Sequence, residues 1–151
     1  MKSNQAFISV MAVVALISFN ACSGDNSDGF EIFEGDISRY TPPCDWKPLL
    51  TDKVYILNSE EQLDECTECD MSGGSCDVDF SNNTILLVSG CIHCQVSETE
   101  WTLIKRADNE YTLRLEMKLK YTPYPETWCI ALNSPKIPSG SDVELEVSYD
   151  Y

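Results

Sequence analysis

The segment from Tyr111 to Tyr121 alternates between apolar and polar residues, and this pattern constrains the fold more than any other feature of the chain. Successive side chains of a β-strand point to opposite faces, so a period of two predicts a strand with one buried and one exposed face. The apolar members are Leu113, Leu115, Met117 and Leu119, and the polar members are Arg114, Glu116, Lys118 and Lys120. A strand with one solvated face favours an antiparallel sheet.

Other segments also have compositions typical of strands. The unbroken apolar run from Thr84 to Ser89 predicts a central strand that is covered on both faces. The residues from Ala107 to Glu110 are typical of a hairpin turn. Further strands are predicted at 54–57, 100–106, 127–132 and 143–149.

One short helix is predicted directly after the strand at 54–57. The sequence Ser-Glu-Glu-Gln at 59–62 is a capping box, and the helix that follows should end near Cys66. The segment 30–48 contains prolines that exclude a central strand or helix, so we expect it to wrap the surface and insert its aromatic side chains into the core. The expected fold class is α+β, with a β-rich, mostly antiparallel sheet or sandwich and one short helix after the first strand.

The N-terminus has the pattern of an export signal. A basic start precedes an apolar run from Ala6 to Phe19, which is shorter than the roughly 20 residues of a membrane-spanning helix. The run is followed by Ala21 and Cys22, which resemble a bacterial lipoprotein cleavage site. The resemblance implies that residues 1–21 are removed and that Cys22 carries lipid. The alternative is an ordinary secretory signal with Cys22 in a disulfide.

The residues after Cys22 are predicted to be a tether. The segment 22–29 has no apolar side chain beyond the cysteine, so nothing offsets the entropy that its ordering would cost. Its acidic residues resemble a weak form of the surface-export signal of Bacteroides-type lipoproteins. We therefore expect an outer-membrane lipoprotein, periplasmic or surface-exposed, with a single β-rich domain over residues 30–151.

The charge balance limits the partners. Acidic residues outnumber basic ones 25 to 10, and the formal net charge is −15 at pH 7. Nucleic acids and anionic membrane surfaces are disfavoured, because both bind basic surfaces. The acidic segment 77–83 starts like a calcium loop but lacks the glycine and glutamate of an EF-hand. We expect no metal, no cofactor and no catalytic residue.

Seven cysteines remain after Cys22. In an oxidising compartment, disulfides are the default for them, although the sequence does not determine their connectivity. Short loops favour Cys69–Cys76 and Cys91–Cys94, and Cys44–Cys66 would join the N-terminal segment to the helix. The disulfide candidates are Cys44, Cys66, Cys69, Cys76, Cys91, Cys94 and Cys129.

Two other functions of the cysteines stay open. The pairs Cys66/Cys69 and Cys91/Cys94 have the spacing of zinc ligands, although export favours oxidation over thiolate ligation. Alternatively, Cys91 and Cys94 flank His93 directly after a central strand, as in a thiol–disulfide oxidoreductase. No long helix is predicted after this motif, and nearby acidic residues would raise a thiol pKa.

Two sets of side chains are candidates for binding. Arg114, Lys118 and Lys120 share one strand face and either meet an acidic partner or keep an exposed face soluble. Tyr121, Tyr124 and Trp128, interspersed with prolines, either form an aromatic platform for a glycan or peptide or pack in the core and turns.

The region 54–149 resembles the C-terminal domain of the protease-complex subunit PrcB. The resemblance rests on the run Tyr-Ile-Leu-Asn-Ser-Glu-Glu-Gln-Leu at 55–63, on Val-Asp-Phe-Ser at 78–81 leading into the strand at 84–88, on the hairpin centred on 109–111, and on the terminal strand after Pro138. The family usually has a glycine-rich stretch where this chain has residues 91–94. The resemblance implies a small, non-enzymatic envelope lipoprotein that assists or restrains a protease.

Overall fold

The computed structural model describes residues 31–33, 36–68 and 77–151. The predicted signal peptide, Cys22, the tether at 22–29, Cys69 and Cys76 lie outside the described residues. No helix in the described part of the chain is long and apolar enough to cross a bilayer.

One long β-hairpin forms the framework of the fold. Strands β4 (Asn83–Ala107) and β5 (Glu110–Pro135) pair antiparallel along most of their length. Asn109 in the turn between them has φ 64°, a left-handed conformation that Asn tolerates well. The sequence predicted four separate strands here, and this prediction was wrong in detail, because β4 and β5 each run on through the predicted gap, although the ladder is interrupted between Tyr121 and Glu126.

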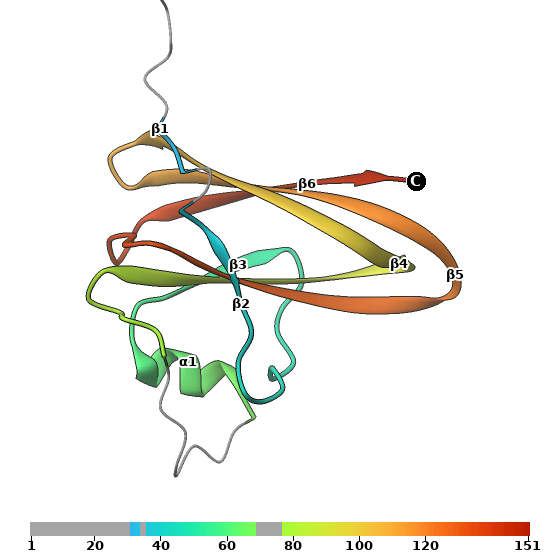
Figure 1. The fold of residues 1–151 in the computed structure, drawn as a ribbon, viewed down its shortest axis with the longest axis horizontal. Helices are drawn as coiled ribbons and strands as arrows, with labels where there is room; N and C mark the ends of the chain where they lie inside the picture. The colour runs from blue at the N-terminus through green and yellow to red at the C-terminus, as the bar shows by residue number, and fades with distance from the viewer. Residues whose placement is uncertain (1–30, 34–35, 69–76) are drawn as a thin grey trace, which may run out of the picture.

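The hairpin bends where this ladder is irregular. Four residues of β5, Thr122 to Pro125, lie opposite the single residue His93 of β4. The prolines at 123 and 125 have no amide hydrogen to donate to a neighbouring strand, so regular pairing is interrupted here. At this bend the hairpin folds back so that its two halves face each other, and they meet at the right of Figure 1.

Four further strands extend the two halves. The half made of 83–92 and 126–135, here the covered half, is flanked by β3 (Lys53–Leu57) and β2 (Ser38–Tyr40). The half made of 94–107 and 110–121, here the open half, is flanked by β1 (Glu31–Ile32) and β6 (Asp142–Asp150). The β5–β6 pair is parallel and every other described strand pair is antiparallel, so the sheet is mostly antiparallel, as predicted.

The main core lies between the two halves. Leu86 and Val88 of the covered half pack in one cluster with Leu113 and Leu115 of the open half, and all four side chains are fully buried. Ile37 and Phe33 from the N-terminal segment join this cluster. Burial of apolar surface on this scale is the main stabilising contribution of the fold.

A second cluster lies on the opposite face of the covered half. Helix α1 (Glu60–Cys66) packs against this face below the sheet (Figure 1). The cluster consists of Leu57, Leu63, Ile85, Leu87 and Ala131. Tyr40 and Trp46 pack against it with their rings edge to face, which agrees with the prediction that the N-terminal segment inserts aromatic side chains into the core.

The helix begins as its sequence predicts. The Ser59 hydroxyl accepts a hydrogen bond from the Gln62 backbone N–H at 3.3 Å, and Gln62 Oε1 accepts one from the Asn58 backbone N–H at 2.6 Å. The helix follows the third strand of the chain rather than the first, because β1 and β2 precede it.

Candidate interaction surfaces of the hairpin

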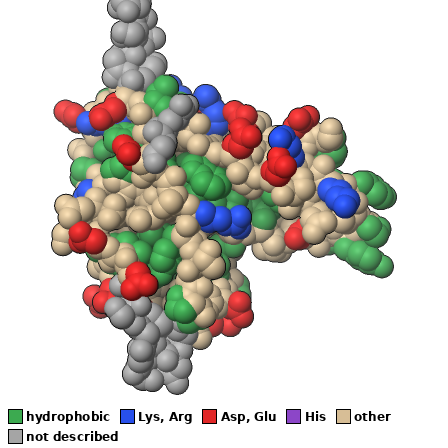
Figure 2. All heavy atoms as spheres, viewed as in Figure 1, with side chains coloured by type: hydrophobic (Ala, Val, Ile, Leu, Met, Phe, Trp, Pro, Cys, Tyr) green, Lys and Arg blue, Asp and Glu red, His purple; other side chains and the backbone are tan. Residues whose placement is uncertain are grey.

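The bend of the hairpin exposes two large aromatic side chains. Residues 121–125, here the tip, contain Tyr121 and Tyr124, which are 83% and 76% exposed. The Thr122 hydroxyl donates a hydrogen bond to the Tyr124 carbonyl oxygen at 3.1 Å, which fixes the loop locally. Figure 2 shows apolar side chains protruding at the right-hand end of the molecule, where the hairpin bends. The tip is therefore an exposed aromatic surface held by paired strands on both sides.

Trp128 does not belong to this surface. Its side chain is buried in the main core, and it lies opposite Gly90 in the ladder. A Cβ atom at Gly90 would lie 2.3 Å from Trp128 Cζ2, so the indole occupies the space that a larger residue at position 90 would need. Of the two interpretations of the aromatic residues, Trp128 follows the one in which it packs in the core, because its strand position directs the ring between the two sheet halves.

The outer face of the open half carries the predicted basic side chains. Lys118 Nζ forms an ion pair with Glu98 at 2.6 Å, and Arg114 forms one with Glu146 at 2.9 Å. Two of the three predicted cations therefore have acidic partners on neighbouring strands, and only Lys120 has no ion pair within the described residues. This pairing favours the interpretation in which the charges keep an exposed sheet face soluble.

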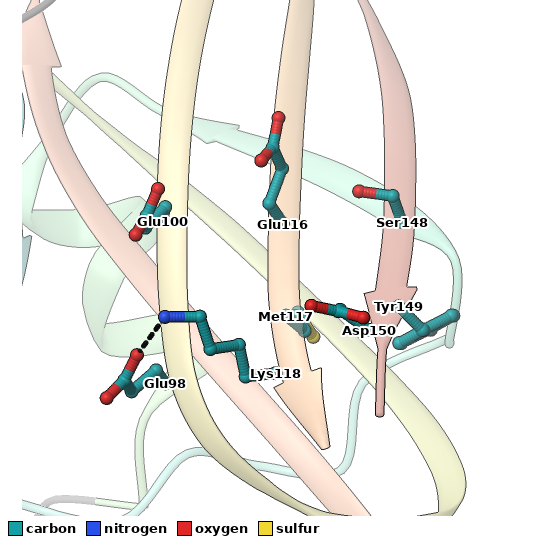
Figure 3. Close-up of a pocket in the computed structure, with 8 residues that line it drawn as sticks. All are labelled: Glu98, Glu100, Glu116, Met117, Lys118, Ser148, Tyr149 and Asp150. Atoms are coloured by element: carbon teal, nitrogen blue, oxygen red, sulfur yellow. Dashed lines mark hydrogen bonds and ion pairs between the residues drawn. The ribbon is translucent and has the colours of Figure 1, made fainter.

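The Lys118–Glu98 ion pair shifts the pKa of both of its side chains. Lys118 donates a hydrogen bond to Glu98 and attracts its negative charge, which lowers the pKa of Glu98 and raises that of Lys118. Figure 3 shows Lys118 extending toward Glu98. Glu100 and Glu116 lie directly opposite each other in the ladder, a like-charged arrangement that destabilises a strand pair.

These carboxylates do not define a metal site. Glu98, Glu100, Glu116 and Asp150 line one shallow pocket with Lys118, as drawn in Figure 3. No group of three or more His, Cys, Asp or Glu side chains in the described ranges is arranged to hold a metal ion. Chemically, the arrangement is a mixed-charge surface in which one ammonium group offsets several carboxylates.

Cys91 and Cys94 point to different environments. Cys91 is exposed, Cys94 is buried in the main core, and both are free thiols. Ile92 and Cys94 both contact the main core, whereas the exposed Cys91 faces away from it, so the two thiols point apart. The predicted Cys91–Cys94 pairing is therefore wrong. The same geometry removes the basis for a redox motif, since it separates the thiols and leaves His93 exposed at the bend.

The predicted Cys44–Cys66 pairing is also wrong. Cys44 is disulfide-bonded, but Cys66 is a free thiol that packs against the second cluster. Cys129 packs against the same cluster and is also free. Burial raises the pKa of Cys66, with a smaller contribution from Glu65, and burial raises the pKa of Cys129 to about 11.

Sequence reasoning missed the acidic partners on β6. The sequence predicted a strand at 143–149, but not that it lies beside β5. The register pairs Arg114 with Glu146 and Lys118 with Asp150. No local pattern could have revealed this contact. The chain enters β6 from the end of β5 in the covered half, but β6 lies beside the start of β5 in the open half.

Comparison of the chain with protein-family models, with curated proteins and with solved structures finds no match in any of the three. The resemblance to PrcB therefore stays a prediction that rests on the sequence motifs alone.

Proposed function

We propose that this chain is a lipid-anchored protein of the cell envelope that binds another protein through the tip of its long hairpin. It acts without catalysis, as an accessory to or regulator of a secreted protease. The observation that carries the proposal is the exposure of Tyr121 and Tyr124 at the bend. Tyrosine is enriched in protein interfaces, where its ring adds contact area and its hydroxyl a hydrogen bond.

The architecture of the tip supports a binding role. Residues on both sides of the tip are held in the β4–β5 ladder, through the pairs Cys94–Tyr121 and Ile92–Glu126. A surface ordered in this way loses little conformational entropy when a partner binds, so more of the contact energy appears as affinity. Both tyrosine side chains are mostly exposed, so packing against the described residues does not account for them.

The proposed contact can be tested by site-specific photocrosslinking in living cells. A photoreactive phenylalanine analogue would replace Tyr121 or Tyr124, and the control would carry it at Ile32, which is 55% exposed and pairs with Ile104, far along β4 from the tip. We expect an adduct with an envelope protease from the tip positions only. Equal adducts from all three positions, or none from the tip, would contradict the proposal.

A second variant tests whether the tip supplies binding energy. The double substitution Tyr121→Ser and Tyr124→Ser should weaken binding to the crosslinked partner by at least about tenfold, since truncation of one interfacial hot-spot residue costs about 2 kcal/mol or more. Ile32→Ser, far from the tip, should leave the affinity unchanged. Both affinities can be measured by surface plasmon resonance with the purified partner.

The anchor is tested separately, because its failure would not affect the tip. We expect intact-mass and peptide analysis of the purified protein to find lipid on Cys22. The Cys22→Ser variant should leave the membrane fraction and accumulate in the soluble fraction. Unmodified Cys22 in the wild-type protein would refute lipid anchoring.

A further inference from the structure

Cys66 and Cys129 are far apart in the sequence but pack against the same hydrophobic cluster. Cys66 is the last residue of α1, and Cys129 lies on β5 in the covered half. Alternate residues of a strand share a face, so Cys129 is on the same side of β5 as Ala131, which is a buried member of this cluster. The helix end and the strand therefore present their thiols to one shared region.

The surroundings of the two thiols also overlap. The Lys47 backbone N–H donates a hydrogen bond to the Cys66 carbonyl oxygen at 2.9 Å, which holds the end of α1 against the N-terminal segment. Residues 47–49 line a cavity of about 440 Å³ that Cys66 borders and another of about 450 Å³ that Cys129 borders. The charge of a Cys66 thiolate adds to the rise in the pKa of Cys129, so the two sulfur atoms lie within electrostatic reach.

The other described free thiols are badly placed to react with either residue. Cys94 is buried between the two sheet halves, on the opposite face of the sheet. Cys91 pairs with Thr127, so it is the diagonal neighbour of Cys129. Diagonal neighbours have Cα atoms about 7–8 Å apart, whereas a disulfide needs Cβ atoms within about 4.5 Å.

We propose that Cys66 and Cys129 form a disulfide that fastens helix α1 to strand β5. Each thiol loses its proton, and the two sulfur atoms together give two electrons to an external disulfide, which is reduced to two thiols. In the cell the oxidant is the disulfide of an envelope dithiol oxidase, and in vitro oxidised glutathione serves. The bond would fix a seven-residue helix whose one buried side chain is Leu63. This inference is independent of the proposed partner.

The test uses the full-length protein, reduced and then equilibrated in buffers with a rising ratio of oxidised to reduced glutathione. Remaining thiols are alkylated, and peptides are mapped by mass spectrometry without reduction. We expect a crosslinked peptide that contains Cys66 and Cys129, together with parallel loss of alkylation at both. The matched control, Cys91→Ser, should retain the crosslink. By contrast, Cys66→Ser should leave Cys129 open to alkylation, and Cys129→Ser should leave Cys66 open to it.

Alkylation of both thiols in every oxidising buffer would overturn the proposal, as would a disulfide from either residue to any other cysteine. If a serine variant does not fold, the wild-type peptide map decides the question alone. Loss of the tip interaction would leave this result unchanged, since the disulfide lies in the covered half.

Discussion

The two halves of the β4–β5 hairpin are continuous in the chain but differ in how many of their faces are covered. In the covered half, every residue from Thr84 to Gly90 is buried, because the open half lies against one face and α1 with the N-terminal segment lies against the other. In the open half, Leu113, Leu115, Met117 and Leu119 are buried, while the intervening residues are partly or fully exposed. One face of this half meets solvent.

The difference shows that the residue pattern of a strand records the number of covered faces rather than the identity of its neighbours. An unbroken apolar run is typical of a strand that is covered on both faces, and alternation is typical of a strand that is covered on one face. The boundary between the two regimes falls just before the bend, where buried Gly90 is followed by exposed Cys91. The tip projects at this boundary, where neither layer covers it.

The largest expected effect is in the covered half. Leu87 is fully buried against the helix side of the sheet, so Leu87→Ala should lower the free energy of unfolding by about 3 kcal/mol through lost burial and a residual cavity. The matched substitution on the outer face of the open half, Glu100→Ala, should change it by less than about 0.5 kcal/mol. Urea denaturation measures both. Similar losses of stability from the two substitutions would contradict the difference between the two halves.

The reactivity of the Cys129 thiol should show whether this residue lies within the covered part of the sheet. Because burial raises the pKa of Cys129 to about 11 from an ordinary 9.0, its thiolate fraction at neutral pH should fall roughly a hundredfold. The alkylation rate of Cys129 in the reduced protein should then rise about tenfold per pH unit from pH 7 to 10. Mass spectrometry of iodoacetamide adducts gives the rate. The same rate for Cys129 and exposed Cys91 at pH 7 would contradict this assignment.

The same raised pKa has a consequence for stability. The neutral thiol is favoured in the folded state, so this contribution is present below the pKa of the unfolded chain and is lost as pH rises toward 11. The reduced protein should therefore lose stability in alkaline solution, and Cys129→Ala should lose less. Thermal melts between pH 8 and 10.5 compare the two. An equal alkaline loss in both proteins would exclude Cys129 as a source.

A smaller loss of stability is expected from a substitution in the covered half close to the bend. The side chain added by Gly90→Ala would overlap the Trp128 ring, with a closest approach of 2.3 Å, and should cost about 1–3 kcal/mol through overpacking. Adding Trp128→Leu to Gly90→Ala should make the cost of the glycine change smaller, because the clash is gone. A double-mutant cycle by urea denaturation measures this coupling. Strict additivity would show that the ring can move aside.

The smallest effect belongs to the exposed charges of the open half. Glu146 binds both Arg106 and Arg114, at 3.4 and 2.9 Å, with its side chain 38% exposed. Glu146→Gln should destabilise the protein by about 0.5 kcal/mol, and added salt should reduce the difference, because exposed ion pairs are weak and screened. Denaturation at two salt concentrations checks this, and a loss above 2 kcal/mol would mean that the pair has a structural role.

Much of the local structure could be predicted from short stretches of sequence. The capping box at 59–62 predicted the start of α1, and the alternation from 111 to 121 predicted which side chains are buried. The candidate site was less predictable: Tyr121 and Tyr124 are exposed and Trp128 is buried, a division that the sequence left open, and the pairing of Cys91 with Cys94 was wrong. Both outcomes depended on which face of β4 or β5 a residue occupies near the bend.

The sequence by itself determined the strand periodicity, the helix cap and the number of covered faces, because these depend on residues within a few positions of one another. Only the tertiary structure decided that the four predicted strands make one folded hairpin, that β6 lies parallel to β5, and that Lys118 and Arg114 meet carboxylates. It also decided that Cys66 and Cys129 share one cluster. The physical reason is that these contacts join segments far apart in the chain, whose pairing is selected by the packing of the whole core.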